Sequence, residues 1–151
     1  MKIGFGADHN AFHFKEELLA YIKELGYEVV DFGAYSEEDI DYPNIAFQVS
    51  KAIKDKKIDR GILCCGTGIG MAIAANKVSG IRAAQIFESY GAQRAQLSNN
   101  AQIITFGAFV QGIASAKELA KEYLANGFQS GTGSERKINQ ICQYEQQTHG
   151  E

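Results

Sequence analysis

Residues Asp59–Gly70, DRGILCCGTGIG, are the most informative part of this sequence about its fold class. Its apolar first half is typical of a strand that is buried on both faces of a sheet. Gly66, Gly68 and Gly70 then form a tight loop, and the residues from Met71 onward have helical character. A buried strand that leads through a short loop into a helix is the first half of a β-α-β unit. The stretch therefore predicts a parallel sheet covered by helices.

The segments on both sides of this stretch repeat the alternation of strand and helix. Gly26, Pro43 and Gly127 mark helix boundaries. The predicted strands are Lys2–Ala7, Tyr27–Phe32, Asp59–Cys65, Ile81–Phe87 and Gln102–Phe106, and the predicted helices are Phe12–Leu25, Pro43–Lys56, Met71–Val78, Ser89–Leu97 and Ile113–Asn126. This order predicts a three-layer α/β/α sandwich, doubly wound and Rossmann-like, with a five-stranded parallel sheet.

Length and composition are those of one globular domain. The chain has 151 residues, of which 45% are hydrophobic and 22% charged, and domains most often have about 100–150 residues. We expect a single domain over residues 1–151. A polar C-terminal extension begins at about residue 128 and carries a further possible helix at Glu135–Gln146.

Charge and cysteine content exclude several classes of protein. Lys and Arg total 15 against 18 Asp and Glu, so the net charge of −3 gives a nucleic-acid partner no electrostatic support. The chain has three cysteines, an odd number that cannot all pair in disulfides, and they do not have the spacing of zinc ligands. No apolar run approaches the ~18 residues of a membrane span. The N-terminus does not resemble a signal peptide. We therefore expect free thiols in a reducing cytoplasm, and neither a disulfide scaffold, a zinc module nor a membrane protein.

The loop after Cys65 is the sharpest candidate site. In a doubly wound sheet, ligands bind outside the carboxyl ends of the strands. At that edge the glycines allow backbone N–H groups to converge beside the thiol, where a helix begins. Such groups bind an oxyanion and favour a thiolate. A base and an oxyanion hole in one loop suit proton abstraction next to a carbonyl, and the alternative is a buried structural cysteine beside a tight turn.

Competing interpretations of the same residues are weaker. Cys64 faces the opposite side of the strand, so we expect it in the core. A dinucleotide-binding fingerprint needs glycine where Met71 stands, and a P-loop needs a Gly-Lys-Ser/Thr sequence that this chain lacks. A redox thiol protein is disfavoured because Cys65 has no nearby resolving cysteine.

Polar residues lie at other candidate positions. Asp8 and His9 end the first strand, where they could hold substrate hydroxyls or orient a proton transfer, or Asp8 could cap the following helix. Asp41 and Tyr42 are either polar groups of an edge loop or helix-entry residues. Ser98–Asn100 precede the fifth strand, and amides there either bind sugar hydroxyls or form a turn.

Several separate motifs carry a resemblance to a known family. They are GADH at 6–9, VDFG at 30–33, DYP at 41–43, CGTGIGMAIAANK at 65–77, GIRAA at 80–84 and TFG at 105–107. In this order they resemble the ribose-5-phosphate isomerase B family, which includes galactose-6-phosphate isomerase subunits and tetrose-phosphate isomerases. The resemblance covers nearly the whole chain.

The resemblance implies an activity and an assembly. It implies an isomerase that interconverts an aldose phosphate and a ketose phosphate through a cis-enediolate, with neither a metal nor another cofactor. It also implies a homodimer, or a dimer of dimers, whose active sites lie between the subunits. The partners would be a small sugar phosphate and a second copy of the chain, with no nucleic acid and no membrane.

The resemblance also assigns roles to residues. Cys65 becomes the base that moves a proton between carbons 1 and 2, and Thr67 assists the transfer. The backbone N–H groups of Gly66, Gly68 and Gly70 stabilise the enediolate. Asp8 and Asn99 hold substrate oxygens, and His9 and Tyr42 line the pocket.

One departure from the family concerns the sugar. Ser98 stands where the ribose-specific pattern of the family has a histidine, to which the resemblance assigns the opening of the furanose ring. A tetrose with phosphate on carbon 4 cannot form a furanose ring, so it needs no ring opening. The stretch Leu97–Thr105 also resembles the D-erythrulose-4-phosphate isomerase branch. We therefore favour a tetrose phosphate, with ribose 5-phosphate isomerisation or a non-catalytic subunit of a hetero-oligomer as alternatives.

A second departure concerns the phosphate. Phe109 occupies a position that is usually arginine in the family, and the later arginine-rich pattern is reduced to Arg136 and Lys137. Each charge-assisted contact to phosphate contributes about 1.5–3 kcal/mol, so the loss matters for affinity. Either Arg136, Lys137 and His9 suffice, or the phosphate binds differently, or the substrate carries none.

Overall fold

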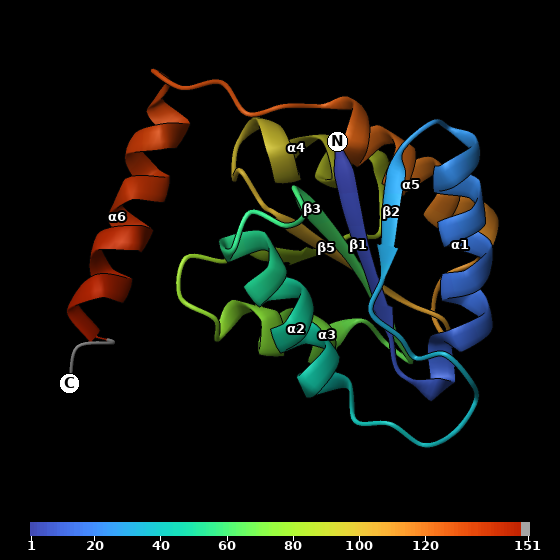
Figure 1. Cartoon of the computed structure of the whole chain (residues 1–151). Helices are drawn as coiled ribbons and strands as arrows, with labels where there is room; N and C mark the ends of the chain where they lie inside the picture. The colour runs from blue at the N-terminus through green and yellow to red at the C-terminus, as the bar shows by residue number, and fades with distance from the viewer. Residues whose placement is uncertain (149–151) are drawn as a thin grey trace.

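Five parallel strands form a single sheet with helices on both faces (Figure 1). The computed structural model describes residues 1–148, so the end of the domain predicted over 1–151 lies outside it. The strands are β1 (Lys2–Ala7), β2 (Glu28–Asp31), β3 (Arg60–Cys65), β4 (Ala83–Gln85) and β5 (Ile103–Gly107), and the helices are α1 (Phe12–Glu24), α2 (Tyr42–Lys54), α3 (Ile69–Asn76), α4 (Ser89–Leu97), α5 (Ile113–Ala125) and α6 (Gly133–Thr148), with the short 3-10 helix η1 (His9–Ala11). The strand order is β2-β1-β3-β5-β4, and the predicted sandwich is confirmed.

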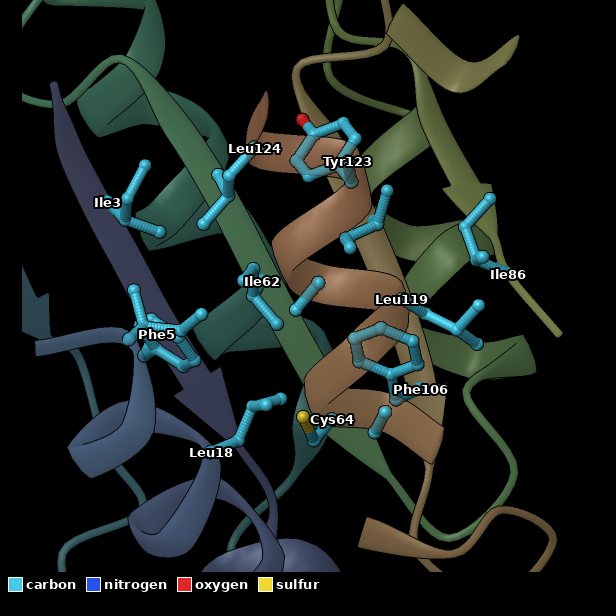
Figure 2. Packing of buried hydrophobic residues seen from close by; sticks show 14 of the residues in the cluster. Ile3, Phe5, Leu18, Ile62, Cys64, Ile86, Phe106, Leu119, Tyr123 and Leu124 are labelled. Atoms are coloured by element: carbon cyan, nitrogen blue, oxygen red, sulfur yellow. The ribbon is translucent and has the colours of Figure 1, made fainter. Parts of the chain in front are cut away.

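Two apolar cores separate the three layers. One core packs α1, α4 and α5 against the sheet and contains Phe5, Cys64 and Tyr123 (Figure 2). The other packs α2 and α3 against the opposite face and contains Leu63 and Cys65. Neighbouring residues of β3 alternate between the cores because side chains of a strand point to opposite faces in turn. The prediction that Cys64 is a core residue is confirmed.

A crevice forms where the connections from two adjacent strands diverge. β1 lies between β2 and β3, and α1 leads from β1 to one side of the sheet while α3 leads from β3 to the other. Helices that leave neighbouring parallel strands in opposite directions open a crevice at the carboxyl ends of those strands. Asp8 follows β1 and Cys65 ends β3, and the Asp8 N–H donates to the Cys64 carbonyl at 3.2 Å. The fold therefore brings Asp8 and Cys65 to this crevice.

Most element boundaries differ from the sequence-based expectation by one or two residues, and three differences have a clear physical meaning. The helix expected from Met71 begins at Ile69, because Gly68 caps it in a left-handed conformation with φ of 81°. The strand expected over Ile81–Phe87 shortens to Ala83–Gln85, since β4 is an edge strand that pairs with β5 alone. The helix expected over Glu135–Gln146 extends over the whole of α6.

The last helix differs from the others in its packing. α6 lies beside the sandwich and is joined to it by an extended segment (Figure 1). Ile138 is its buried residue, while Ile141 and Tyr144 are exposed. Among residues 1–148, no helix combines the length and apolar character needed to cross a membrane.

Cys64 makes the stability of the fold depend on pH. Burial raises the pKa of its thiol well above the ordinary range. The unfolded thiol ionises near pH 8.5 and the folded one stays protonated, so stability falls above that pH by about 1.4 kcal/mol per pH unit for this proton.

We expect Cys64→Ala to reduce this alkaline loss of stability, at a cost of about 1–2 kcal/mol at pH 7 from lost packing. Urea unfolding at pH 7 and pH 10, with the free energy of unfolding compared between variants, measures the effect. Cys142→Ala removes a thiol outside both cores and should keep the wild-type pH dependence. An identical pH dependence in Cys64→Ala and wild type would contradict the prediction.

Candidate active site

The thiol of Cys65 lies at the floor of the crevice and is 4% exposed. Its Sγ accepts a hydrogen bond from the Gly68 N–H at 3.1 Å. The left-handed conformation of Gly68, which favours glycine, turns this N–H back toward the thiol. The local sequence therefore fixes a sulfur atom against a backbone donor at the start of α3.

Further backbone donors belong to the loop that follows the thiol. Among the described residues, no acceptor of the chain takes up the N–H groups of Gly66, Thr67 or Gly70. The first N–H groups of a helix have no partner within the helix, and a cluster of them attracts negative charge. The loop can therefore stabilise an oxyanion that develops next to the sulfur.

Close packing against β5 and β4 holds this loop in place. The Thr105 hydroxyl donates to the Gly68 carbonyl at 2.9 Å, and the Gln85 amide donates to the Thr67 carbonyl. A Cβ at Gly107 would lie 2.4 Å from the carbonyl carbon of Thr67. The absence of a side chain at residue 107 is thus what allows the loop to approach the strand.

A pocket of about 450 Å³ opens over the thiol. Its lining is Asp8, Tyr42, Cys65, Gly66, Thr67, Ile69, Gly70, Ile73 and Phe109. Six residues singled out from the sequence as site residues are in this set. A seventh, Gly68, is not in the lining, but its N–H donates to the thiol. The lining contains no lysine and no arginine.

Asp8 and Tyr42 each combine a structural contact with a place in the pocket. Asp8 is 5% exposed, and its Oδ1 accepts from the Ala11 N–H at 3.2 Å, so it caps η1 and also lines the pocket. The ring of Tyr42 packs so closely on Gly70 that a Cβ at residue 70 would lie 2.5 Å from Tyr42 Cζ. The two interpretations left open by the sequence, capping and substrate contact, are therefore compatible.

His9 follows Asp8 in the chain but is not among the residues that line the pocket, and the segment that precedes α2 holds it. Its Nε2 lies 3.0 Å from an oxygen of Asp39, and the Ile40 N–H lies 3.3 Å from its Nδ1. Its ring is partly exposed. The imidazole is thus oriented by residues that are distant in sequence.

Asn99 is not in this pocket. Asn99 precedes β5, whose first residue, Ile103, pairs with Gly61 of β3. The last residue of β5, Gly107, pairs with Cys65. The length of the strand, roughly 13 Å, therefore separates the edge of the sheet near Asn99 from the edge that carries the pocket. The Asn99 carbonyl accepts from the Arg82 guanidinium at 3.1 Å, and Arg82 also contacts the Asn100 carbonyl and, at 3.9 Å, the sulfur of Cys142 in α6. Arg82 thereby joins the turn before β5 to α6.

Arg136 and Lys137 lie outside the pocket as well. Both are exposed residues near the start of α6. Ser98, which replaces the family histidine, accepts from the Arg94 Nε at 2.6 Å. Asn99, Arg136 and Lys137 therefore act on a substrate at Cys65 only if they belong to another copy of the chain.

The apolar wall of the pocket was not anticipated. Ile69, Ile73 and Phe109 form it and are 52%, 56% and 70% exposed, while Met71 and Ala75 of the same helix face the core. An available signal was that α3 is apolar on all sides, which is typical of a helix covered on more than one face. No group of three or more His, Cys, Asp or Glu residues within 1–148 is arranged to hold a metal ion.

Gly107→Ala should test the contact between the loop and the sheet. The added methyl group meets the backbone of Thr67 and cannot rotate away, so we expect a destabilisation of about 1–3 kcal/mol and a displaced loop. Urea unfolding gives the first quantity, and the rate of Cys65 alkylation reports the second. Gly127→Ala is the control, because a Cβ there meets no atom within 4 Å. Equal stability of both variants would argue against a tightly fitted loop.

Comparisons with known proteins extend these observations. Residues 3–141 match the Ribose/Galactose Isomerase family. The chain is 46% identical over 146 residues to ribose-5-P isomerase B of Listeria innocua, with 97% of this chain and 98% of that protein covered. It is 47% identical over 149 residues to D-erythrulose-4-phosphate isomerase of Pectobacterium atrosepticum, with 97% of each covered. The solved structure of ribose-5-phosphate isomerase B from Clostridium thermocellum superposes with a TM-score of 0.94 at 41% identity, covering 97% of this chain and 99% of that one.

Proposed function

This chain belongs to the ribose/galactose isomerase family and is an aldose–ketose isomerase of sugar phosphates, and we propose that it interconverts D-erythrulose 4-phosphate and D-erythrose 4-phosphate. The observation that carries the chemistry is the Cys65 thiol beside a cluster of free backbone N–H groups. The replacement of the ring-opening histidine by Ser98 supports the tetrose. Relatives named for tetrose and for pentose substrates have nearly equal identity to this chain, so the family alone leaves the sugar open.

In the proposed mechanism Cys65 is the base. The Gly68 N–H at 3.1 Å stabilises its thiolate, which removes the proton from carbon 2 of the aldose. The electron pair of that C–H bond forms the cis-enediolate, whose negative charge the N–H groups of Gly66, Thr67 and Gly70 stabilise. The Cys65 thiol then returns the proton to carbon 1 to give the ketose. The Thr67 hydroxyl and the Asp8 carboxylate assist proton transfer between the two substrate oxygens.

Replacement of Cys65 should abolish isomerisation without unfolding the protein. Without the base, we expect Cys65→Ala and Cys65→Ser to lose a factor of about 10²–10⁴ in kcat and in solvent deuterium exchange at carbon 2. Cys64→Ala is the matched control, because this neighbouring thiol faces the other core and should retain activity. Full turnover in Cys65→Ala would refute the assignment of the base.

The same exchange assay discriminates the substrates. Wild-type protein should have a higher kcat/KM for erythrose 4-phosphate than for ribose 5-phosphate, since ring opening is unnecessary for the tetrose. A clear preference for ribose 5-phosphate would refute the argument from Ser98. Absence of exchange with all C4–C6 sugar phosphates would instead favour a non-catalytic subunit.

We also propose that a second copy of the chain completes each active site. Among the described residues, the pocket lining contains no lysine and no arginine, and its apolar wall of Ile69, Ile73 and Phe109 is exposed. Charge-assisted contacts strengthen the binding of a phosphate dianion, and Arg136 and Lys137 of the other copy would supply them. Asn99 of that copy would hold a substrate oxygen, and burial of the wall would stabilise the homodimer.

Mixing two inactive variants tests this arrangement. If Cys65 and Asn99 of one site come from different chains, hybrid dimers of Cys65→Ala and Asn99→Ala contain one intact site. Random exchange of subunits should then restore about a quarter of wild-type activity. A mixture of Cys65→Ala with Cys65→Ser cannot form an intact site and is the control. Hybrid dimers that are seen by native mass spectrometry and remain inactive would overturn the proposal.

Residues 1–151 are proposed to form one isomerase domain, with α6 belonging to its C-terminal extension. We further propose that the protein works in the cytoplasm. Its three free cysteines support this, because a reducing compartment keeps thiols unpaired.

A further inference from the structure

Lys15 is a charged side chain that lies completely inside the protein. It belongs to α1 and is 0% exposed. Its Nζ lies 2.8 Å from both oxygens of Asp31, 2.7 Å from the Ala34 carbonyl oxygen and 2.9 Å from Glu16 Oε1. Burying an ammonium group is costly unless such contacts satisfy it, so this arrangement requires an explanation beyond helix formation.

The Lys15 contacts fix the start of the segment Gly33–Asp41, which connects β2 to α2 (Figure 1). Asp31 Oδ1 also accepts from the Gly33 N–H at 2.9 Å. Gly33 and Ala34 in turn exchange hydrogen bonds with Ala7, at 2.6 and 2.7 Å. The start of the segment is therefore held against the end of β1, next to Asp8.

The far end of the same segment holds His9 and leads to the pocket. Asp39 and Ile40 supply the contacts to both nitrogens of the His9 ring. Tyr42, which lines the pocket, follows directly. Between its two ends the segment is mostly exposed. There the Tyr35 hydroxyl donates to the Asp31 carbonyl at 3.0 Å, and Glu37 contacts His13 of α1. The course of the segment therefore depends on a few anchors, of which the Lys15 contacts are the buried ones.

We propose that Lys15 is a positioning residue for substrate binding. Its ammonium group fixes the Ala34 carbonyl and thereby the course of Gly33–Asp41. This segment orients His9, the neighbour of Asp8, and leads directly into Tyr42 of the pocket lining. The inference rests on the isomerase function proposed above. Cys65 and its N–H donors belong to β3 and α3 instead, and Asp8 is held separately by its bonds to the Cys64 carbonyl and the Ala11 N–H. Lys15 therefore governs the binding of substrate rather than the transfer of the proton.

Lys15→Met tests this division, because methionine keeps an unbranched apolar stem and removes the ammonium group. We expect KM to rise about tenfold while kcat stays within about twofold of wild type. The variant also leaves Asp31 without its cation, which destabilises the protein. The double variant Lys15→Met/Asp31→Asn removes that unpaired charge, so its stability should recover while its KM stays high. A KM that returns to the wild-type value in the double variant would overturn the proposal.

A readout independent of substrate separates this inference from the proposed function. We expect the His9 imidazole NMR signals of the free protein to shift in Lys15→Met and in the double variant. Lys117→Met is the control. Lys117 of α5 forms an ion pair with Glu17, which lies in α1 as Lys15 does but does not belong to the Gly33–Asp41 segment. This variant should change neither KM nor the His9 signals. Unchanged His9 signals in Lys15→Met would overturn the role of Lys15. Shifted signals in a protein that isomerises no sugar phosphate would leave that role intact and refute the proposed function.

Discussion

The turn between β3 and α3 governs the geometry of the whole site. Its backbone must reverse within a few residues, approach β5 closely and still direct the Gly68 N–H to the sulfur of Cys65. Left-handed backbone at Gly68 and the missing side chain at Gly107 make this geometry possible. The hydrogen bonding of the loop to the thiol therefore depends on the packing of the loop against the sheet. A change that moves the turn away from β5 also moves the N–H donors away from the thiol.

The sequence predicts this turn well for a physical reason. A strand of period two assigns Cys64 and Cys65 to opposite faces, and alternating glycines leave few conformations for the loop. Contacts between distant segments are harder to predict. Lys15 would be taken for a solvated helix residue, and its burial depends on Asp31 and Ala34, which only the folded chain brings to it. The shortness of β4 is hard to predict for the same reason. β4 is short because it lies at the edge of the sheet, and the sequence of a single strand does not show its position in the sheet.

The wall of the pocket is a further feature that hydrophobicity along the sequence does not predict. Ile69, Ile73 and Phe109 look like core residues in the sequence, yet they are exposed beside the thiol. Asn99, Arg136 and Lys137 present the opposite problem, because their chemistry suits the site and the fold places them elsewhere. Hydrophobicity and charge indicate which environment favours a side chain, but the topology of the fold and the assembly of the chains determine where the side chain lies.

Arg82 has a consequence for how two copies would work together. Its guanidinium group holds the turn that carries Asn99 and also contacts Cys142 in α6, the helix that carries Arg136 and Lys137. Asn99, Arg136 and Lys137, which we propose one chain contributes to the pocket of the other, are therefore connected through Arg82 within their own chain. They would reach the neighbouring pocket as a single preformed unit, so that docking of the subunits places the oxygen-binding amide and the cations in one step.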